Sequence, residues 1–576
     1  MNVDNKELAR VLWETADLME IAGEDSFRIR SYRNGATAIE GHPESISLIL
    51  QDSSRKVTDI PGIGKGLAAV LQEIETTGSC ERRNLLLAKY PPTALEFLKI
   101  QGLGPKSIAL LFEHFQVATM DQLEQLCRNQ KLRDLPRMGA KLEEKVLRSI
   151  AQYRLRTGRF LLSVAQQTAD ELAAYLNPAG DLEVTPAGSL RRGRETVGDL
   201  DLLVTGPSAI DALERMATHP RVQEVLSRGE NKTSVKLGRD GMQVDVRALP
   251  RESFGSAMQY FTGSKEHNVA IRQRAVRMGL KLSEYGLFRV EGDAKIAGET
   301  EEGVYQALGL AWIPPELREN LGEIELAAQG TVPELVRLDE IRGDLHMHTT
   351  ETDGRATLEE MAEAARERGY EYIAITDHSK SLAMANGLDE ARVSAFAKRV
   401  RRLNEDGGLG IRIFSGIECD IMKDGEMDLS WDSLAELDFV IGSVHNNMNM
   451  ESAEMTDRFL RALECPSLKV LGHLSGRLLL NRDPYPFDFD RVAGEAVKRG
   501  VMFEINSSPE RLDLNAAMAR AAKSKGGKFV INTDAHHPKH LANMRYGVAT
   551  ARRAWLSPND VLNTRTAATF AAALMC

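Results

Sequence analysis

The sequence predicts a multidomain protein with an all-α N-terminal part, an α/β middle part and a C-terminal (β/α) barrel. The chain has 576 residues, whereas single hydrophobic cores stop growing near roughly 250 to 300 residues. Apolar residues recur at helical spacing before residue 150, and short strand-like runs appear from about residue 180. After residue 340, seven strand-like runs alternate with helical patterns, which is typical of a parallel sheet closed into a barrel.

The composition is that of a globular chain and excludes membrane-spanning, collagen-like and wholly disordered proteins. Hydrophobic residues make up 43% and charged residues 27%, the mean hydropathy is -0.29, and no apolar run approaches the ~18 to 20 residues of a membrane span. We therefore expect no membrane partner. The N-terminus is acidic and polar, unlike a secretory signal, and the five cysteines are widely spaced without a CxxC pair. These features predict a cytoplasmic location.

Two similar segments lie in the all-α part. Residues 60–65 (IPGIGK) and 100–106 (IQGLGPK) share an apolar-x-Gly-apolar-Gly pattern before a helical run. Glycine allows a tight turn, and the start of the following helix offers unpaired N–H groups to a phosphate. A lone copy would be an ordinary helix–helix turn, but two copies resemble helix-hairpin-helix motifs, which grip a DNA backbone. The predicted DNA-contacting residues are Gly62, Gly64, Lys65, Gly102, Gly104 and Lys106.

The net charge of -10 neither supports nor excludes a nucleic-acid partner; if nucleic acid binds, local patches must hold it, and the basic segment 265–277 is one such patch.

Three carboxylates stand out in the middle part. Asp199 and Asp201 lie two apart in a strand, so they point to the same face, and Asp245 lies in a second strand. Such a group suits Mg²⁺, and two ions held there would activate an attacking oxygen and stabilise a leaving pyrophosphate. An exposed strand with alternating Asp is the alternative. The upstream turn with Gly188 and Ser189 favours nucleotidyl transfer, because it can cradle phosphates.

The motifs GSLRRG, GDLDLL, VDVR and QYFTGSKEHNVAIRQRA resemble those of family X DNA polymerases, of the DNA polymerase beta kind, over roughly residues 1–320. The resemblance implies that Asp199, Asp201 and Asp245 are catalytic ligands for Mg²⁺ or Mn²⁺. It also implies contacts to an incoming dNTP from Gly188, Ser189, Arg192, Gly198, Tyr260, Phe261, Gly263, Asn268 and Arg272.

The sequence departs from that family's pattern at three positions. Val70 stands where some relatives carry a lyase lysine, and valine cannot form a Schiff base. Gln243 replaces an arginine beside the third aspartate, and Lys265 replaces an aspartate over the incoming base. We therefore expect no lyase activity from position 70 and an altered nucleotide selection.

Potential metal ligands gather in the C-terminal part, where six of eight histidines lie at the ends of predicted strands. The C-terminal strand ends of a (β/α) barrel meet at one face. Any single histidine would be a core residue, but imidazoles together with carboxylates suit Zn²⁺, Mn²⁺ or Fe²⁺. The predicted ligands are His346, His348, Asp353, His378, Glu418, His445, His473, Asp534 and His536.

This ligand pattern resembles the polymerase and histidinol phosphatase (PHP) domain, a metal phosphoesterase with a distorted (β/α)7 barrel. The resemblance implies three ions, Zn²⁺ or Mn²⁺. One takes His346, His348, Glu418 and Asp534; the second takes Glu418, His445 and His473; the third takes Asp353, His378 and His536. Asp377, Arg477 and His537 either support the ligands, bind phosphate or lie at the surface.

Together these parts resemble the bacterial family X polymerases. The implied domains are an 8-kDa-like helix-hairpin-helix domain (1–82), a helical DNA-binding subdomain (83–150), a nucleotidyltransferase palm (151–250), a thumb that contacts the nascent base pair (251–320), a linker (321–340) and the PHP domain (341–576). The resemblance implies a monomeric DNA repair polymerase that acts on gapped or primer–template DNA, with a 3′–5′ exonuclease in the PHP domain. Cleavage at abasic sites and removal of 3′-phosphates stay open as alternative activities of that domain.

Two alternatives stay open. One is a template-independent nucleotidyltransferase joined to a small-molecule phosphatase of the histidinol-phosphate type. The other is a DNA-end-binding scaffold with inactive domains.

Overall fold

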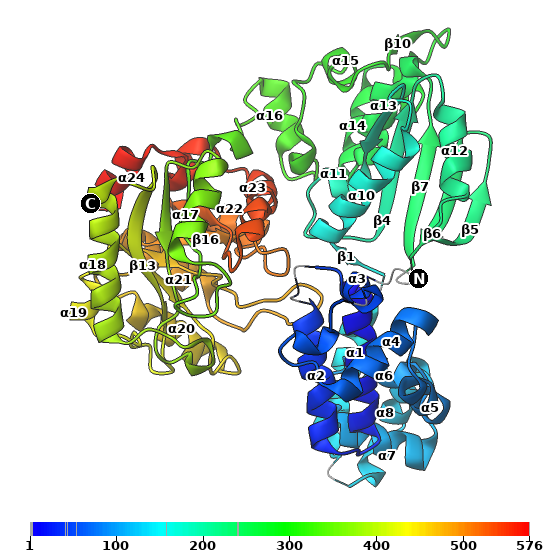
Figure 1. Cartoon of the computed structure of the whole chain (residues 1–576). Helices are drawn as coiled ribbons and strands as arrows, with labels where there is room; N and C mark the ends of the chain where they lie inside the picture. Colours follow the sequence, from blue (N-terminus) through cyan, green and yellow to red (C-terminus); the bar gives the residue numbers. More distant parts are fainter. Residues whose placement is uncertain are drawn as a thin grey trace. The chain divides into compact units, whose positions relative to one another are not determined.

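The computed structural model of the chain forms two compact units, Met1–Thr157 and Gly158–Cys576 (Figure 1). The structure describes residues 4–40, 42, 44–52, 54–136, 138–156, 158–238 and 241–574. Among these residues, no helix has the length and apolar character needed to cross a membrane.

The first unit is helical in all its described regular elements, as predicted. Helix α1 begins after Asp4, whose side chain accepts a hydrogen bond from the Glu7 N–H. Leu8 and Leu12 of α1 are fully buried in the core of the unit. The helices are α1 (Asn5–Ile21), α2 (Ser26–Glu40), α3 (Ile46–Gln51), α4 (Lys65–Thr77), α5 (Glu81–Lys89), α6 (Thr93–Phe97), α7 (Pro105–Phe115), α8 (Met120–Arg128) and α9 (Ala140–Arg156).

The second unit begins with a five-stranded sheet in the order β2-β4-β7-β6-β5. β4 and β7 are parallel, and the other neighbours are antiparallel. Leu200 and Leu202 of β4 are buried in the core, so the other face of this strand carries Asp199 and Asp201. The elements are β1 (Phe160–Leu161), α10 (Leu162–Leu176), β2 (Glu183–Pro186), α11 (Gly188–Arg191), β3 (Thr196–Val197), β4 (Asp199–Thr205), α12 (Ala209–Ala217), β5 (Val222–Arg228), β6 (Lys232–Leu237) and β7 (Met242–Ala248).

A smaller helical region with a three-stranded sheet follows the palm sheet. Its elements are α13 (Phe254–Thr262), α14 (Lys265–Arg277), β8 (Leu280–Ser283), β9 (Gly286–Arg289), β10 (Lys295–Ala297), α15 (Glu301–Ala307) and α16 (Glu323–Gln329). Ile324 and Ala327 of α16 pack in the same core as Leu287 and Tyr305, so much of the predicted linker, 321–340, is an ordered part of this region.

A buried ion-pair network joins this region to α11. Glu301 accepts hydrogen bonds from Arg191 at 2.7 and 2.8 Å and from Arg318 at 2.6 Å. Burial alone would raise the pKa of Glu301, but the hydrogen bonds and charges of the two arginines outweigh it and lower the pKa to about 2. This carboxylate therefore stays ionised at neutral pH.

We expect Glu301→Gln to destabilise this region by about 3 to 5 kcal/mol, because the change leaves the fully buried Arg318 without its charge partner. The wild-type contribution is complete above the ordinary glutamate pKa of 4.5 and is lost as the pH falls toward about 2. Hydrogen exchange of the α15 and α16 amides at pH 7 measures the effect. Glu302→Gln, at the exposed neighbouring position, is the matched control, and equal exchange in the two variants would contradict the prediction.

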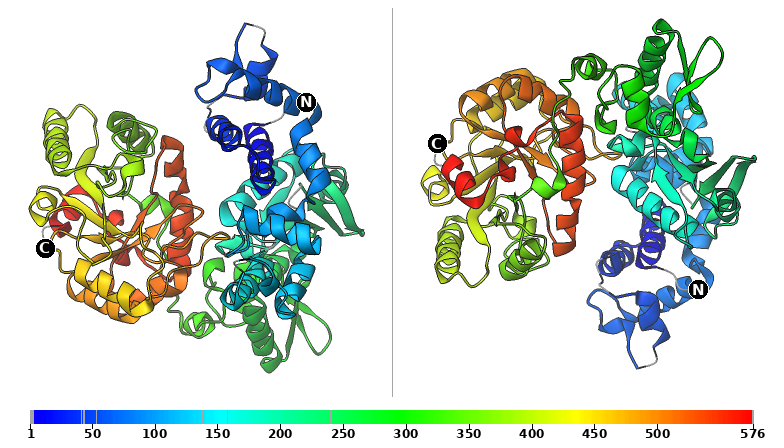
Figure 2. Two further views of the ribbon diagram at one scale, coloured as in Figure 1. Left: turned by 90° about the horizontal axis from the view of Figure 1, so that it is seen from below. Right: turned by 90° about the horizontal axis from the view of Figure 1, so that it is seen from above.

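The remaining elements form the predicted seven-stranded parallel barrel, with strand order β11 to β17. A parallel bridge between Met347 and Ala535 joins the segments that follow the first and last strands. Figure 2 shows helices around the strands. The strands are β11 (Gly343–Asp344), β12 (Tyr372–Ile375), β13 (Arg412–Asp420), β14 (Phe439–Ser443), β15 (Val470–Leu471), β16 (Met502–Asn506) and β17 (Phe529–Asn532). The helices are α17 (Leu358–Glu367), α18 (Glu390–Asp406), α19 (Trp431–Leu434), α20 (Ser452–Ala462), α21 (Phe489–Lys498), α22 (Ala516–Ser524), α23 (Met544–Arg553) and α24 (Ala567–Leu574).

Candidate active sites

The three predicted palm carboxylates lie together on β4 and β7. These strands pair in parallel with Asp199 beside Gln243 and Asp201 beside Asp245. Burial, and then the charges of Asp199 and Asp245, raise the pKa of Asp201 to about 7. The excess of negative charge and the oxygen donors fit a divalent cation such as Mg²⁺.

Lys232 of β6 is a neighbour of these carboxylates that the sequence reasoning missed. Its Nζ lies 2.5 Å from Asp245 Oδ2, and Gln243 donates a hydrogen bond of 3.2 Å to Asp245 Oδ1. Burial opposes the charge on Asp245, but these hydrogen bonds and the lysine charge lower its pKa. Gln243 thus supports the third aspartate as a neutral donor.

The phosphate-binding turn predicted at Gly188 lies against the carboxylates. Gly188 has φ +61°, and a Cβ atom on it would lie 2.8 Å from Asp201 Oδ2, so only glycine fits. Arg192 donates hydrogen bonds to the carbonyl of Thr262 and, at 3.2 Å, to Glu319. The arginine that we expect to bind the triphosphate therefore has a protein carboxylate as its partner here.

Tyr260 and Phe261 lie on α13, Asn268 and Arg272 lie on α14, and Gly263 lies between these helices. The rings of Tyr260 and Phe261 meet edge to face at 5.1 Å, and the Arg272 guanidinium lies 5.7 Å from the Tyr260 ring. Asn268 donates a hydrogen bond of 2.7 Å to the carbonyl of Tyr260. Gly263 lies close to the phosphate-binding turn, since a Cβ atom built on it would lie 3.2 Å from Arg192 Nη1. These contacts connect the segment to the phosphate-binding turn. The roles of these residues, and that of Gly198, stay predictions.

The two glycine turns of the first unit have the same backbone geometry. Gly62 and Gly102 have φ of +94° and +99°, while Gly64 and Gly104 are extended N-cap residues of α4 and α7. No heavy atom of the described residues lies within 4 Å of a Cβ built on Gly64 or Gly104. The N–H groups at both helix starts therefore have space for a phosphate beside them.

The side chains around these turns are consistent with phosphate binding. Lys65 and Lys106 are exposed in the first turns of α4 and α7, where a cation adds to the attraction for a phosphate. Val70 packs against the helical core, and its alkyl side chain has no nucleophilic atom.

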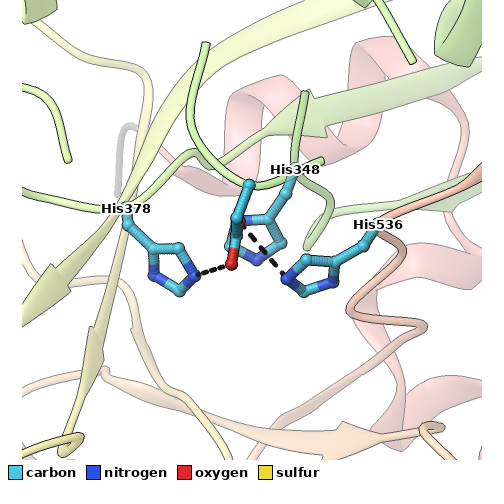
Figure 3. Close-up of side chains that lie close together, drawn as sticks. His348, His378 and His536 are labelled. Atoms are coloured by element: carbon cyan, nitrogen blue, oxygen red, sulfur yellow. Dashed lines mark ion pairs between the residues drawn. The ribbon is translucent and has the colours of Figure 1, made fainter. Parts of the chain in front are cut away.

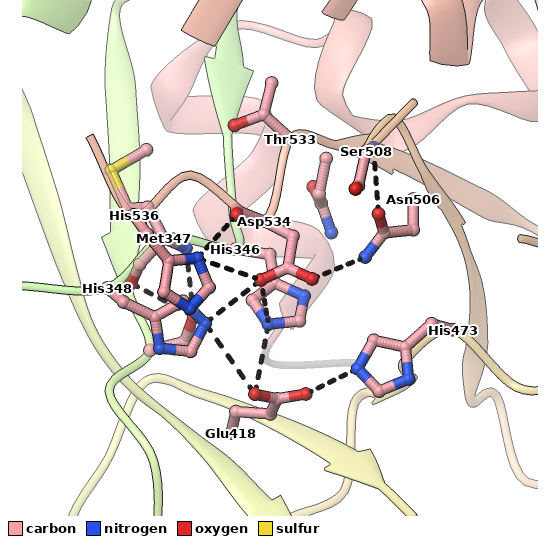
Figure 4. A network of polar contacts seen from close by, with 12 residues as sticks. His346, Met347, His348, Glu418, His473, Asn506, Ser508, Thr533, Asp534 and His536 are labelled. Carbon is pink, nitrogen blue, oxygen red and sulfur yellow. Dashed lines mark hydrogen bonds and ion pairs between the residues drawn. The ribbon is translucent and has the colours of Figure 1, made fainter. Parts of the chain in front are cut away.

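All nine ligands predicted for the barrel meet at the C-terminal ends of its strands. Glu418 of β13 is at the centre (Figure 4). Its Oε2 lies 3.4 Å from His346 Nε2, 3.7 Å from His348 Nε2 and 2.9 Å from His378 Nδ1. Its Oε1 lies 2.8 Å from the Nε2 of His473 and 3.4 Å from that of His445.

Two further carboxylates complete the cluster. Asp534 Oδ1 lies 3.2 Å from His348 Nε2. Asp353 lies 3.4 Å from His378 and 3.5 Å from His536, and Figure 3 shows these two imidazoles beside that of His348. Because His348 and His378 each reach more than one ligand group, the predicted assignment of ligands to three ions stays a prediction.

The chemistry of the cluster fits several cations. Among the described residues, the buried atoms His346 Nε2, His348 Nε2 and His378 Nδ1 have no hydrogen-bond partner, which a metal would supply. Burial and the charges of His536 and His378 lower the pKa of His348 to about 3, which keeps it neutral. Burial opposes the charge on His378, but Glu418 and Asp353 raise its pKa to about 10, so metal binding would release its proton.

Strand β16 supplies supporting residues that the sequence reasoning missed. Glu504 is fully buried and lies 2.7 Å from His346 Nδ1, and it accepts a hydrogen bond of 2.8 Å from the His473 N–H. Asn506, also on β16, donates a hydrogen bond of 3.1 Å to Asp534. On β13, Asp420 Oδ1 lies 2.5 Å from His445 Nδ1. The signal in the sequence was a glutamate inside the apolar run VMFEIN.

We expect Glu504→Gln to lower metal affinity about 10- to 100-fold, because the carboxylate orients His346 and makes it a stronger ligand. Metal titration with Mn²⁺, followed by electron paramagnetic resonance, measures the change. Glu495→Gln, on the surface helix α21, is the control. Unchanged affinity in the Glu504 variant would exclude this supporting role.

Asp377, Arg477 and His537, whose roles the sequence left open, each have an identified partner in the structure. Asp377 accepts hydrogen bonds from the Thr349 N–H at 2.8 Å and hydroxyl at 2.6 Å, so it holds the loop between His348 and Asp353. Arg477 pairs with Glu195, and His537 accepts a hydrogen bond from the Lys539 N–H.

The fold and the two sites define a class of protein: a nucleotidyltransferase palm joined to a metal-binding phosphoesterase barrel. Sequence comparison matches residues 3–80 to a helix-hairpin-helix domain and 94–152 to a SAM-like helix-hairpin-helix tandem. Residues 257–319 match the DNA polymerase beta thumb, and residues 344–508 match the PHP domain.

Relatives extend the match over nearly the whole chain. The DNA polymerase/3′-5′ exonuclease PolX of Bacillus subtilis (strain 168) is 36% identical over 97% of both chains. DNA polymerase lambda of Arabidopsis thaliana is 24% identical over 54% of this chain and 62% of its own. A probable phosphatase of Thermoanaerobacter sp. (strain X514) is 27% identical over 38% of this chain and 89% of its own. The chain therefore belongs to the bacterial family X DNA polymerases that carry a C-terminal PHP domain.

Proposed function

We propose that the palm fills short gaps in DNA during repair by two-metal nucleotidyl transfer with dNTPs. The placement of Asp199, Asp201 and Asp245 on adjacent parallel strands, beside the Gly188 turn, carries this proposal. Mg²⁺ or Mn²⁺ bound there would activate the primer 3′-oxygen and neutralise the leaving pyrophosphate. The chain's own part is to hold the carboxylates together and to offer Arg192 to the triphosphate.

For the barrel, we propose a metal-dependent 3′–5′ exonuclease that uses Zn²⁺ or Mn²⁺, with three ions. The nine convergent ligands and the neutral His348 support this proposal. The nine ligands would hold ions that supply a nucleophilic water and neutralise the phosphate when bound. Asp353, whose side chain is 37% exposed, and His536, at 30%, mark the side of the cluster that is open to a substrate. Abasic-site cleavage and 3′-phosphate removal use the same chemistry.

A 5′-labelled primer on a one-nucleotide gapped duplex tests both proposals in one assay with Mn²⁺. With dNTPs we expect extension by one nucleotide, and without dNTPs we expect shortening from the 3′ end. If the chain does neither, both proposals fail, and nucleotides and small phosphate esters become the substrates to test.

The template-independent alternative predicts extension of a single-stranded primer as readily as of a gapped duplex. The scaffold alternative predicts DNA binding without turnover. We favour the polymerase because the two glycine turns and the basic segment of α14 suit duplex DNA. The monomeric state and the cytoplasmic location stay predictions.

We expect Lys65→Ala/Lys106→Ala to weaken binding to gapped DNA, because each lysine stands beside a phosphate-binding helix start. The slope of the logarithm of the binding constant against the logarithm of the salt concentration should fall by about two, one for each lost phosphate contact. Fluorescence anisotropy at several salt concentrations measures both quantities. The double variant Lys89→Ala/Lys131→Ala, on exposed lysines away from the glycine turns, is the control. Equal losses in both double variants would contradict contact at the turns.

A further inference from the structure

The loop between β16 and α22, residues 507–515, has one arginine beside the metal-ligand cluster. Arg511 Nε lies 3.6 Å from Asp534 Oδ2, and its side chain is 20% exposed. An arginine presents a planar set of donors that matches two oxygens of a phosphate. Arg511 thus stands where a phosphodiester bound to the ions would meet a protein cation.

The next residue of this loop packs into the palm. Leu512 is fully buried and belongs to the same hydrophobic cluster as Leu190 and Val197 of the palm. Its backbone has φ +43°, a region that leucine rarely adopts. Burial among palm side chains offsets the cost of this conformation. The palm therefore contributes to the position of the 507–515 loop.

A buried arginine ties the same loop to a palm carboxylate. Arg477 donates to the carbonyl of Arg511 at 2.9 Å and to the carbonyl of Leu512. The same guanidinium donates to both oxygens of Glu195, at 2.7 and 3.0 Å. Glu195 lies in the palm between α11 and β3. Arg477 thus links the palm residue Glu195 to two neighbouring residues of the loop. One of them, Arg511, faces the metal cluster, and the other, Leu512, lies in the palm core.

We propose that the palm completes the active site of the barrel. Glu195, through Arg477, and the palm pocket around Leu512 are positioning elements that hold Arg511 against the phosphate of a phosphodiester substrate. This inference rests on the proposed phosphoesterase function of the barrel. The shape of one active site then depends on a side chain of the other catalytic domain.

The test measures hydrolysis of bis(4-nitrophenyl) phosphate by the full-length chain with Mn²⁺, which requires neither DNA binding nor polymerisation. We expect Arg511→Ala to lower kcat/KM on the order of 10²-fold, as for loss of a preorganised donor to a developing charge. Glu195→Ala should lower kcat/KM about tenfold with unchanged metal content, and Glu195→Asp should lose less. Because Glu195 acts only by positioning the Arg511 guanidinium, the kcat/KM of Glu195→Ala/Arg511→Ala should be no lower than that of Arg511→Ala alone.

Glu316→Ala is the matched control. Glu316 also forms an ion pair with a barrel arginine, Arg552, at 2.6 and 3.3 Å. Among the described residues it has no hydrogen bond or ion pair with the 507–515 loop, so we expect normal kcat/KM. A Glu195→Ala variant as active as Glu316→Ala overturns the inference and leaves the phosphoesterase standing.

Three other results would also count against it. Loss of metal from Arg511→Ala would mean that Arg511 only supports Asp534. Fully additive losses in the double variant would mean that Glu195 acts elsewhere. A wild type that cleaves neither this diester nor DNA removes the phosphoesterase function itself.

Discussion

Replacing Glu418 by Gln is expected to abolish primer shortening while leaving primer extension intact. Glu418 faces five imidazoles, with both of its oxygens directed into the cluster. Burial alone would raise its pKa, but the surrounding imidazole charges hold the pKa well below its ordinary value, so the native group is a carboxylate. Glutamine keeps the volume, but it removes the negative charge and replaces one carboxylate oxygen by an NH₂ group that cannot bind a cation.

The expected loss is on the order of 10³ to 10⁴-fold in the exonuclease rate, since a metal ion supplies several kcal/mol of transition-state stabilisation. Metal content, measured by inductively coupled plasma mass spectrometry, should fall in parallel. Glu405→Gln, at an exposed position of α18, is the control. If the Glu418 variant shortens primers at the wild-type rate, the barrel cluster is not the nuclease site.

The sequence predicted the ligand sets because their placement follows from local rules. Asp199 and Asp201 lie two apart on β4, so strand periodicity puts them on one face. His346 and His348 lie two apart in the segment that directly follows β11. Parallel strand order then brings distant strand ends together. The all-α unit and the seven barrel strands followed from periodicity in the same way, and the structure confirms both.

The supporting contacts could not be predicted in this way. Lys232 reaches Asp245 across two antiparallel strands, and its distance depends on the register of β6. Arg477 forms an ion pair with Glu195, which lies 282 residues away in the sequence. Leu512 packs in a core formed by another domain. The contacts of Arg477 and Leu512 depend on the packing of domains, about which a residue's sequence neighbours carry no information.

The reciprocal result is expected for the palm: Asp201→Ala should abolish extension and leave shortening unchanged. Asp201 lies between Asp199 on its own strand and Asp245 on β7, and Gly188 leaves just enough room for its carboxylate. Burial, and then the charges of Asp199 and Asp245, raise its pKa to about 7, so a cation is needed to hold all three carboxylates ionised. Removing it takes away one ligand and much of the field that attracts two metal ions.

We expect extension to fall on the order of 10³ to 10⁴-fold, by the same several kcal/mol of lost charge stabilisation. Single-turnover incorporation on the gapped duplex measures it, and Asp211→Ala, on the exposed face of α12, is the control. Shortening should persist because every ligand of the barrel cluster remains. If Asp201→Ala also stopped shortening while its metal content and fold were intact, the two activities would share one site, and the assignment of the nuclease to the barrel would be wrong.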